Sequence, residues 1–195
     1  LLVVPKLPEI EGISEFEGKL IHTARWDHGY DLAGKRVAVI GTGATSIQLV
    51  PAIADRVARI DLYQRTPIWL MPKPNPKLSP GFQRLLRFVP FTQRLLRWAM
   101  NLLVEVVFGL GFIRYKTHPG VFRFIEKKLV EFIRQEIPDP AMQEKLTPKY
   151  AYFCKRPSFS NSFYASLRRP NVELVTDPIE RVTKSSSERE RRSTL

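Results

Sequence analysis

A strand–turn–helix–strand pattern within residues 35–63 is the feature that most constrains the fold. A short run of β-branched and apolar residues at 35–40 leads directly into a glycine-rich turn at 41–46. Apolar residues then recur at roughly helical spacing, and a second strand-like run follows at 58–63. This order is typical of the opening of a βαβ unit, in which a helix connects two parallel strands. The sequence therefore predicts an α/β fold.

The glycine-rich turn has the pattern of a turn that binds the pyrophosphate of a dinucleotide. Glycine at the first position allows the tight turn, and glycine at the second lets the backbone approach the ligand. The third position holds Ser46, which is small enough for close helix–strand packing. The pyrophosphate would lie at the helix N-terminus, where free N–H groups and the helix dipole favour an anion. The pattern favours a Rossmann-type domain over a turn without a ligand, and its candidate cofactor contacts are Gly41, Thr42, Gly43, Ala44, Thr45 and Ser46.

The end of the second strand indicates which dinucleotide would bind. An NAD site usually places Asp or Glu about 20 residues after the turn, on the ribose 2′-hydroxyl. Residues 62–67 contain no acidic side chain, and Arg65 stands there beside the hydroxyl of Thr66. A guanidinium at this place suits a 2′-phosphate, which favours NADP over NAD. The alternative is a solvated arginine at a strand end.

Positive charge is concentrated in the middle of the chain. The net charge is +12, and residues 61–118 contain nine Lys and Arg against two acidic residues. Four prolines between 71 and 81 indicate a linker into a helical stretch. Two interpretations of its basic amphipathic part, 82–113, remain open. It covers the substrate side of an enzyme with its arginines in solvent, or it makes peripheral contact with an anionic membrane. Nucleic acid is not an expected partner, because no nucleic-acid-binding signature is present.

Cysteine usage excludes two kinds of site. Cys154 is the only cysteine, so an intramolecular disulfide and a cysteine-based zinc site are both excluded, and we predict no metal site. A single cysteine fits a reducing compartment, so we expect a cytoplasmic location, with membrane association as the alternative. The first residues do not have the pattern of a secretory signal, and the chain starts with Leu rather than Met. We therefore expect a fragment of a longer protein.

Residues 16–27 resemble the fingerprint of Baeyer–Villiger monooxygenases, F-x-G-x-x-x-H-x-x-x-W followed by P or D. All five fixed positions agree, namely Phe16, Gly18, His22, Trp26 and Asp27. Four other segments are similar to the same family: 34–46, 64–67, 154–157 and 171–175. The resemblance covers roughly residues 1–75 and 138–184.

The resemblance implies a flavoprotein that uses FAD, NADP(H) and O₂ to insert one oxygen atom into a ketone or onto a heteroatom. The active-site arginine of the family maps onto Arg156, the candidate catalytic residue, where a fixed cation can stabilise developing negative charge. The contacts to the 2′-phosphate map onto Lys155, Arg65 and Thr66. The fingerprint belongs to a linker between two nucleotide domains, so we expect it to couple domains rather than to take part in the chemistry.

The predicted organisation has two parts, a linker at 1–34 and an NADP-binding domain at 35–195. A mostly helical insertion interrupts that domain at about 75–148, and a polar tail ends it at about 185–195. The chain departs from the family at Phe153, where a small residue is usual. It also contains only the second of the family's two glycine-rich turns. We therefore expect the FAD domain to be absent and the chain alone to be inactive.

Two other functions remain open. One is a flavin-containing monooxygenase that oxidises sulfur or nitrogen, against which the Trp26-Asp27 ending of the fingerprint argues. The other is a truncated, non-catalytic fragment that binds a nucleotide or docks on a membrane.

Overall fold

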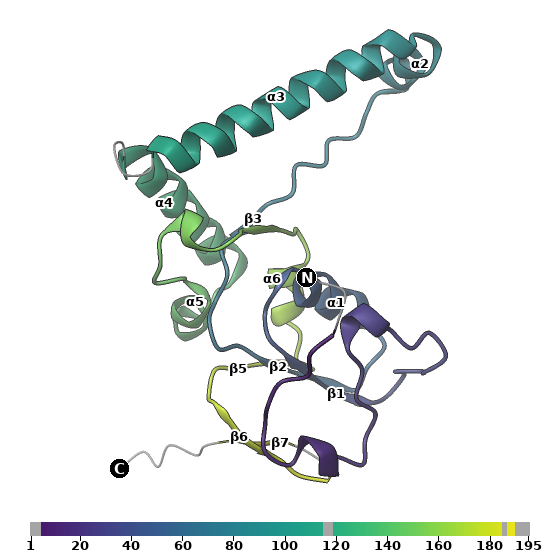
Figure 1. The fold of residues 1–195 in the computed structure, drawn as a ribbon, viewed down its shortest axis with the longest axis vertical. Helices are drawn as coiled ribbons and strands as arrows, with labels where there is room; N and C mark the ends of the chain where they lie inside the picture. Colours follow the sequence, from purple (N-terminus) through teal and green to yellow (C-terminus); the bar gives the residue numbers. More distant parts are fainter. Residues whose placement is uncertain (1–4, 115–118, 185–186, 190–195) are drawn as a thin grey trace.

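The computed structural model describes residues 5–114, 119–184 and 187–189. At its centre is a parallel three-stranded sheet with the strand order β1-β2-β5 (Figure 1). The strands are β1 (Arg36–Ile40), β2 (Arg59–Tyr63) and β5 (Val172–Val175). The glycine-rich turn leads from β1 into α1 (Ala44–Ile53), and the chain then returns to β2. This arrangement confirms the predicted α/β fold of Rossmann type.

The main core lies between the sheet and the helices that cover it. Ile60 and Leu62 of the central strand β2 point to the same face of the sheet, where they are fully buried. Ile47 and Val50 of α1 pack into the same cluster, and burial of such a side chain contributes about 1.5–3 kcal/mol. β1 lies at the edge of this sheet, and the side chain of Ile40 is exposed at its end. The helix α6 (Phe163–Leu167), which precedes β5, adds further apolar side chains to the core.

Besides α6, the long connection between β2 and β5 contains four further α-helices. They are α2 (Pro80–Phe88), α3 (Pro90–Arg114), α4 (Pro119–Glu136) and α5 (Pro140–Leu146). Each begins with a proline, which suits the first turn because the missing N–H would have no intrahelical partner there. Ser79 and Asp139 cap α2 and α5 with side-chain oxygens that accept backbone hydrogen bonds.

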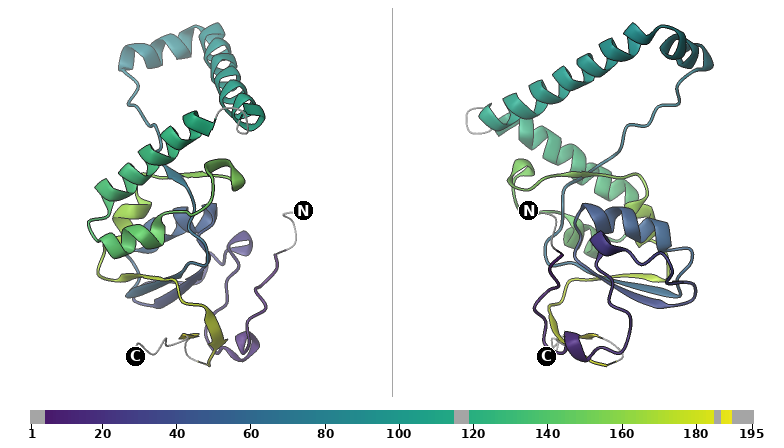
Figure 2. Two further views of the ribbon diagram at one scale, coloured as in Figure 1. Left: turned by 90° about the vertical axis from the view of Figure 1, so that its left-hand side faces the viewer. Right: turned by 45° about the vertical axis from the view of Figure 1, so that its right-hand side comes forward.

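These four helices differ in their contact with the rest of the chain. Ile133 of α4 and Leu146 of α5 are buried in the main core. By contrast, α2 and α3 project away from the sheet (Figures 1 and 2). Among the described residues, no helix combines the length and the apolar composition that a membrane crossing requires.

Short elements complete the described chain. A parallel pair, β3 (Leu70–Met71) with β4 (Ser158–Phe159), joins the two ends of the long connection. The short helices are η1 (Ile13–Glu15), η2 (Thr23–Arg25) and η3 (Tyr152–Cys154). An antiparallel pair is formed by β6 (Ile179–Val182) and β7 (Ser187–Arg189). β7 lies within the polar tail expected from the sequence, of which 185–186 and 190–195 lie outside the described residues.

Candidate functional site

The glycine-rich turn has the backbone geometry that its sequence predicts. Gly41 has a φ of 97°, in the region that favours glycine, and its N–H donates a hydrogen bond to the Tyr63 carbonyl at 2.9 Å. Gly43 is the N-cap residue of α1, and no side chain caps this helix. No atom lies within 4 Å of a Cβ placed on either glycine, so the turn is open above its backbone. The first N–H groups of α1 are therefore available to an anion.

A side-chain hydrogen bond joins the turn to the loop after β2. The buried Thr42 hydroxyl donates to the Thr66 carbonyl at 3.0 Å. The parallel register places Ile40 opposite Tyr63, so the two strand ends lie side by side. Arg65, next to Thr66, is exposed. The structure thus brings together the turn and the strand end that the sequence predicted as two parts of one site.

Tyr150 connects the predicted Lys155 to the same loop. The Tyr150 hydroxyl donates a hydrogen bond to the Pro67 carbonyl at 2.9 Å, and the Trp69 indole N–H donates to the Tyr150 carbonyl at 2.9 Å. Burial raises the pKa of Tyr150, which keeps its hydroxyl protonated and able to donate. The Lys155 ammonium lies 4.9 Å from the centre of the Tyr150 ring, a cation–π distance. Lys155 is therefore held beside the loop that carries Arg65.

Arg156 lies next to this assembly without being fixed by it. Its side chain is exposed, and the structure shows no ion pair or hydrogen bond from it within the described residues. Its backbone is fixed from the far side, because the Ser158 N–H donates to the Trp69 carbonyl at 3.0 Å where β4 begins. The backbone near Arg156 is therefore held in position, while its guanidinium is exposed to solvent and accessible to a ligand. No contact in the described part of the chain joins it to the glycine-rich turn.

The fingerprint residues organise the segment before β1. A Cβ on Gly18 would overlap the Phe16 ring, so glycine at this position allows the ring to lie against the backbone. The His22 Nδ1 accepts a hydrogen bond from the Ala24 N–H at 3.1 Å and caps η2. Trp26 follows η2 and is half-buried. These contacts are local to the segment before β1, and the role of the fingerprint in coupling domains stays a prediction.

Asp27 anchors the end of the fingerprint through a charged pair. Its Oδ2 lies 2.9 Å from the Lys19 Nζ, and its Oδ1 accepts the Gly29 N–H at 3.0 Å. The hydrogen bond from Lys19 lowers the pKa of the Asp27 carboxyl, and the same bond raises the pKa of Lys19. Both groups are exposed to solvent, so their attraction is screened. Lys19 and Lys35 lie 5.8 Å and 5.3 Å from the Tyr30 ring centre, which ties the fingerprint segment to the residue before β1.

Comparison with known proteins identifies the family. Residues 1–104 match the family model of flavin-binding monooxygenase-like proteins. The chain belongs to this family. It is 42% identical over 183 residues to a Baeyer–Villiger monooxygenase of Pseudomonas aeruginosa, covering 93% of this chain and 34% of that protein. It is 41% identical to the FAD-binding monooxygenase ktnD of Aspergillus niger, covering 93% of this chain and 30% of that protein. This flavin-binding monooxygenase-like chain thus spans about a third of the length of the curated relatives it matches.

Solved structures show the same fold in monooxygenases of this kind. Cyclohexanone monooxygenase from Rhodococcus sp. Phi1, bound to NADP⁺, has a TM-score of 0.77 and 27% identity, and the match covers 95% of this chain and 41% of that one. The complex of OTEMO with FAD and NADP has a TM-score of 0.77 and 27% identity, with coverage of 98% and 43%. The predicted resemblance to Baeyer–Villiger monooxygenases is confirmed.

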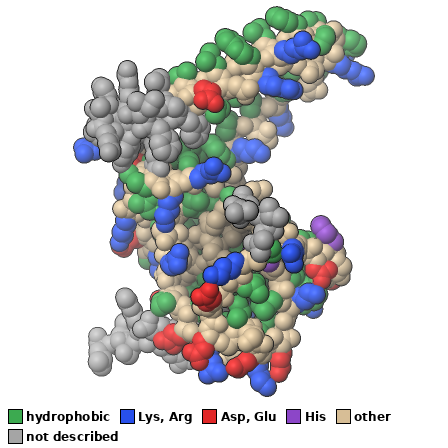
Figure 3. Space-filling view, viewed as in Figure 1, with side chains coloured by type: hydrophobic (Ala, Val, Ile, Leu, Met, Phe, Trp, Pro, Cys, Tyr) green, Lys and Arg blue, Asp and Glu red, His purple; other side chains and the backbone are tan. Residues whose placement is uncertain are grey.

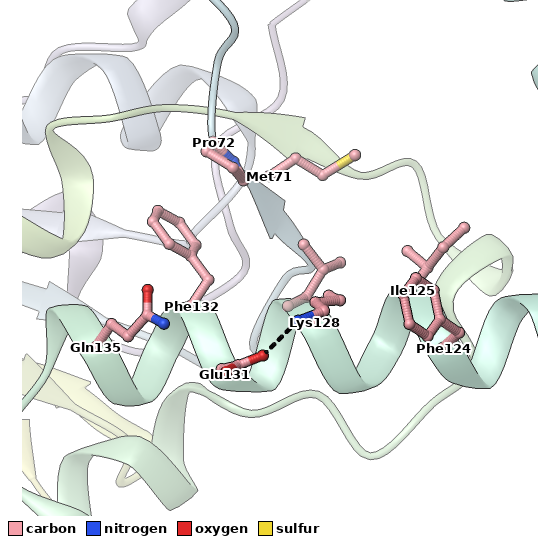
Figure 4. Close-up of a pocket in the computed structure, with 9 residues that line it drawn as sticks. Met71, Pro72, Phe124, Ile125, Lys128, Glu131, Phe132 and Gln135 are labelled. Atoms are coloured by element: carbon pink, nitrogen blue, oxygen red, sulfur yellow. Dashed lines mark hydrogen bonds and ion pairs between the residues drawn. The ribbon is translucent and has the colours of Figure 1, made fainter.

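Two grooves are lined in part by residues of α4. One, of about 440 Å³, is mostly apolar and lies between α4 and β3, with the Lys128–Glu131 ion pair on its lining (Figure 4). None of the predicted site residues lines it. The other, of about 620 Å³, is bordered by Trp69 and Tyr150 and therefore adjoins the candidate site.

Sequence reasoning missed Tyr150 in the candidate site and Tyr30 in the fingerprint segment. Each presents an aromatic ring to a lysine of interest, and neither belongs to a motif used for the prediction. Tyr150 stands five residues before Lys155, and this proximity to a predicted contact is the signal that could have pointed to it.

Proposed function

We propose that this chain is the NADP-binding part of an FAD-dependent Baeyer–Villiger monooxygenase, which inserts one oxygen atom from O₂ into a ketone or onto a heteroatom. The observation that carries the proposal is the connected set of contacts from Thr42 through Thr66 and Pro67 to Tyr150 and Lys155. This set runs from the open turn to Lys155 and passes the loop that carries Arg65, and these two cations would suit a 2′-phosphate. The names of the similar proteins support the same reaction.

Each part of the candidate site has a role in this proposal. The turn at 41–46 and the first N–H groups of α1 hold the pyrophosphate. Arg65, Thr66 and Lys155 hold the 2′-phosphate, and charge-assisted hydrogen bonds make that contact selective. Bound there, NADPH supplies the hydride that reduces a flavin. Arg156 supplies a permanent positive charge for negative charge that develops on oxygen, because a guanidinium stays protonated at working pH.

The domain division belongs to the same proposal. Residues 1–34 act as the linker that carries the fingerprint, and residues 35–195 as the NADP-binding domain with its insertion at about 75–148. The fold supports this division, since β5 completes the sheet that β1 and β2 begin on the other side of the insertion.

Calorimetric titration of the chain with NADP⁺ and with NAD⁺ tests the proposal. We expect NADP⁺ to bind about tenfold to a hundredfold more tightly, because charge-assisted contacts to the phosphate contribute about 1.5–3 kcal/mol. Competition by 2′-AMP would show that the phosphate is what the chain recognises. Equal affinities would contradict the choice of NADP, and lack of binding by both dinucleotides would contradict the site itself.

Tyr150 should position Lys155 for the phosphate. Tyr150→Leu removes the ring beneath the ammonium and the hydrogen bond to Pro67, so we expect NADP⁺ affinity to fall about fivefold, with NAD⁺ affinity unchanged. Tyr150→Phe keeps the ring and should lose less. The same titrations measure both variants. A loss that is equal for the two dinucleotides would mean that Tyr150 supports only the fold.

A further inference from the structure

The helices α2 and α3 form an arm, residues 80–106, which extends beyond the sheet domain. In all three ribbon views the arm stands clear of the sheet and of α1 (Figures 1 and 2). The whole of α3 is about 38 Å long at the usual rise per residue. Large apolar side chains on the arm are exposed: Phe88 is 74% exposed, Phe91 69% and Trp98 63%. A continuous apolar surface of this kind marks an interaction site rather than ordinary protein surface.

The exposed apolar residues of α3 cover most of the circumference of the helix, because Leu96, Met100, Leu103 and Val104 continue the apolar surface beyond its most regular stripe. Phe91, Leu95, Trp98 and Leu102 are spaced at i, i+4, i+7 and i+11, and all four are exposed. On α2 and its C-cap residue, the exposed Phe82, Leu85 and Val89 form a similar stripe at i, i+3 and i+7. Both stripes are therefore open to an apolar partner along their length.

A narrow strip along α3, beside its apolar stripe, is polar and basic, and so is the face of α2 opposite its apolar residues. Arg94 and Arg97 lie one turn apart on α3, with Asn101 and Glu105 continuing that strip. Arg84 and Arg87 lie one turn apart on the basic face of α2. All four arginines are exposed, and none belongs to an ion pair shown by the described residues. Glu105 is the single acidic residue of the arm. Figure 3 shows hydrophobic side chains along the outer edge of the arm, with Lys and Arg beside them.

We propose that the arm binds the surface of an anionic lipid membrane. In this arrangement α2 and α3 lie in the plane of the interface, with the apolar stripes at the level of the acyl chains and the arginines among the lipid phosphates. A helix with a basic polar strip beside a large apolar face is typical of helices that bind anionic membrane surfaces. The charge balance favours lipid over a protein groove, because the four arginines have one acidic neighbour on the arm to pair with. The site of nucleotide binding is separate, so this inference does not depend on the proposed function.

Co-sedimentation with vesicles tests the inference directly on this chain. We expect binding to vesicles of phosphatidylglycerol in phosphatidylcholine, weaker binding to phosphatidylcholine alone, and loss of binding as salt screens the charges. The fluorescence of Trp98, isolated by comparison with Trp98→Phe, should shift to shorter wavelength on binding. Binding that is equally weak on both kinds of vesicle would overturn the proposal.

Charge variants separate the arm from the general positive charge of the chain. Each arginine removed from the arm should weaken partitioning to anionic vesicles about fivefold, so Arg94→Gln with Arg97→Gln should lose about 25-fold. The matched control is Arg25→Gln with Arg36→Gln, which removes the same charge from exposed positions outside the arm. Equal losses for the two pairs would mean that binding is an unspecific effect of net charge and would overturn the proposal.

An apolar variant distinguishes lipid from a protein partner. Leu95→Gln should weaken binding to anionic vesicles while circular dichroism shows the helices retained. If the chain instead self-associates, and Leu95→Gln abolishes that association without any effect on vesicle binding, the arm is a protein–protein surface and the lipid proposal is wrong. Sedimentation velocity at several concentrations measures the association.

Discussion

In the complete enzyme of the proposed function, Arg156→Ala should lower the rate of ketone oxygenation by about 10²- to 10³-fold, the usual cost of removing one preorganised group that stabilises developing charge. Consumption of NADPH should persist, because reduction of a flavin depends on positioning more than on this cation. Oxygen would then leave as hydrogen peroxide instead of entering the product. The measurement compares ester or lactone formed, NADPH consumed and peroxide released in the same reaction.

The structure explains why Arg156 is suited to this role. Lys155 is held over the Tyr150 ring on one side, and β4 begins on the other with the Ser158 hydrogen bond. The backbone of Arg156 is therefore placed while its exposed guanidinium remains open to a ligand. Arg156→Lys is the matched variant, since it keeps a charge but loses the planar fork, and its loss should be smaller. Near-normal oxygenation by Arg156→Ala would show that the residue is only a loop arginine.

Arg65→Ala should reduce the affinity for NADP⁺ by about tenfold to a hundredfold and leave the affinity for NAD⁺ nearly unchanged. Arg65 is exposed beside Thr66, whose carbonyl is fixed by Thr42, so a substitution there removes charge without disturbing the core. Titration of the variant with both dinucleotides measures the change.

Lys73→Ala is the matched control for Arg65. Lys73 is an exposed cation in the proline-rich linker that follows β3. Its hydrogen bonds to the Asn161 side chain are made by its backbone, whose N–H donates to Oδ1 and whose carbonyl accepts from the Nδ2–H. Its removal should affect neither dinucleotide. If Arg65→Ala weakens both dinucleotides equally, then Arg65 does not recognise the phosphate.

The first half of the site could be predicted from sequence because its contacts are local. The turn, α1 and β2 follow each other within 30 residues, and the glycine at 41 is required by its positive φ. The periodicity of apolar residues and the chemistry of the turn both indicate the same βαβ unit, and the structure has it. Ser46, small but not glycine, is buried where the helix approaches the strand.

The second half of the site required the structure. Tyr150 and Pro67 are 83 residues apart, and their contact depends on the parallel pairing of β3 with β4 across the insertion. No periodicity or motif encodes such a contact. Similarly, the amphipathic pattern of the arm would also suit a helix packed against the sheet, so the sequence did not indicate that the arm is exposed.

The placement of β5 beside β2 has a consequence for folding. These strands are neighbours in the sheet, but residues 64–171 separate them, so their pairing must close a long loop after the local β1–α1–β2 unit has formed. Arg65 directly follows this early β1–α1–β2 unit, whereas Lys155 lies in the part of the chain that joins the sheet later, with β5. A dinucleotide held by both would bind the completed domain and not the early unit. Binding would therefore stabilise the whole domain by mass action, by about 2.7 kcal/mol when the ligand exceeds its Kd a hundredfold.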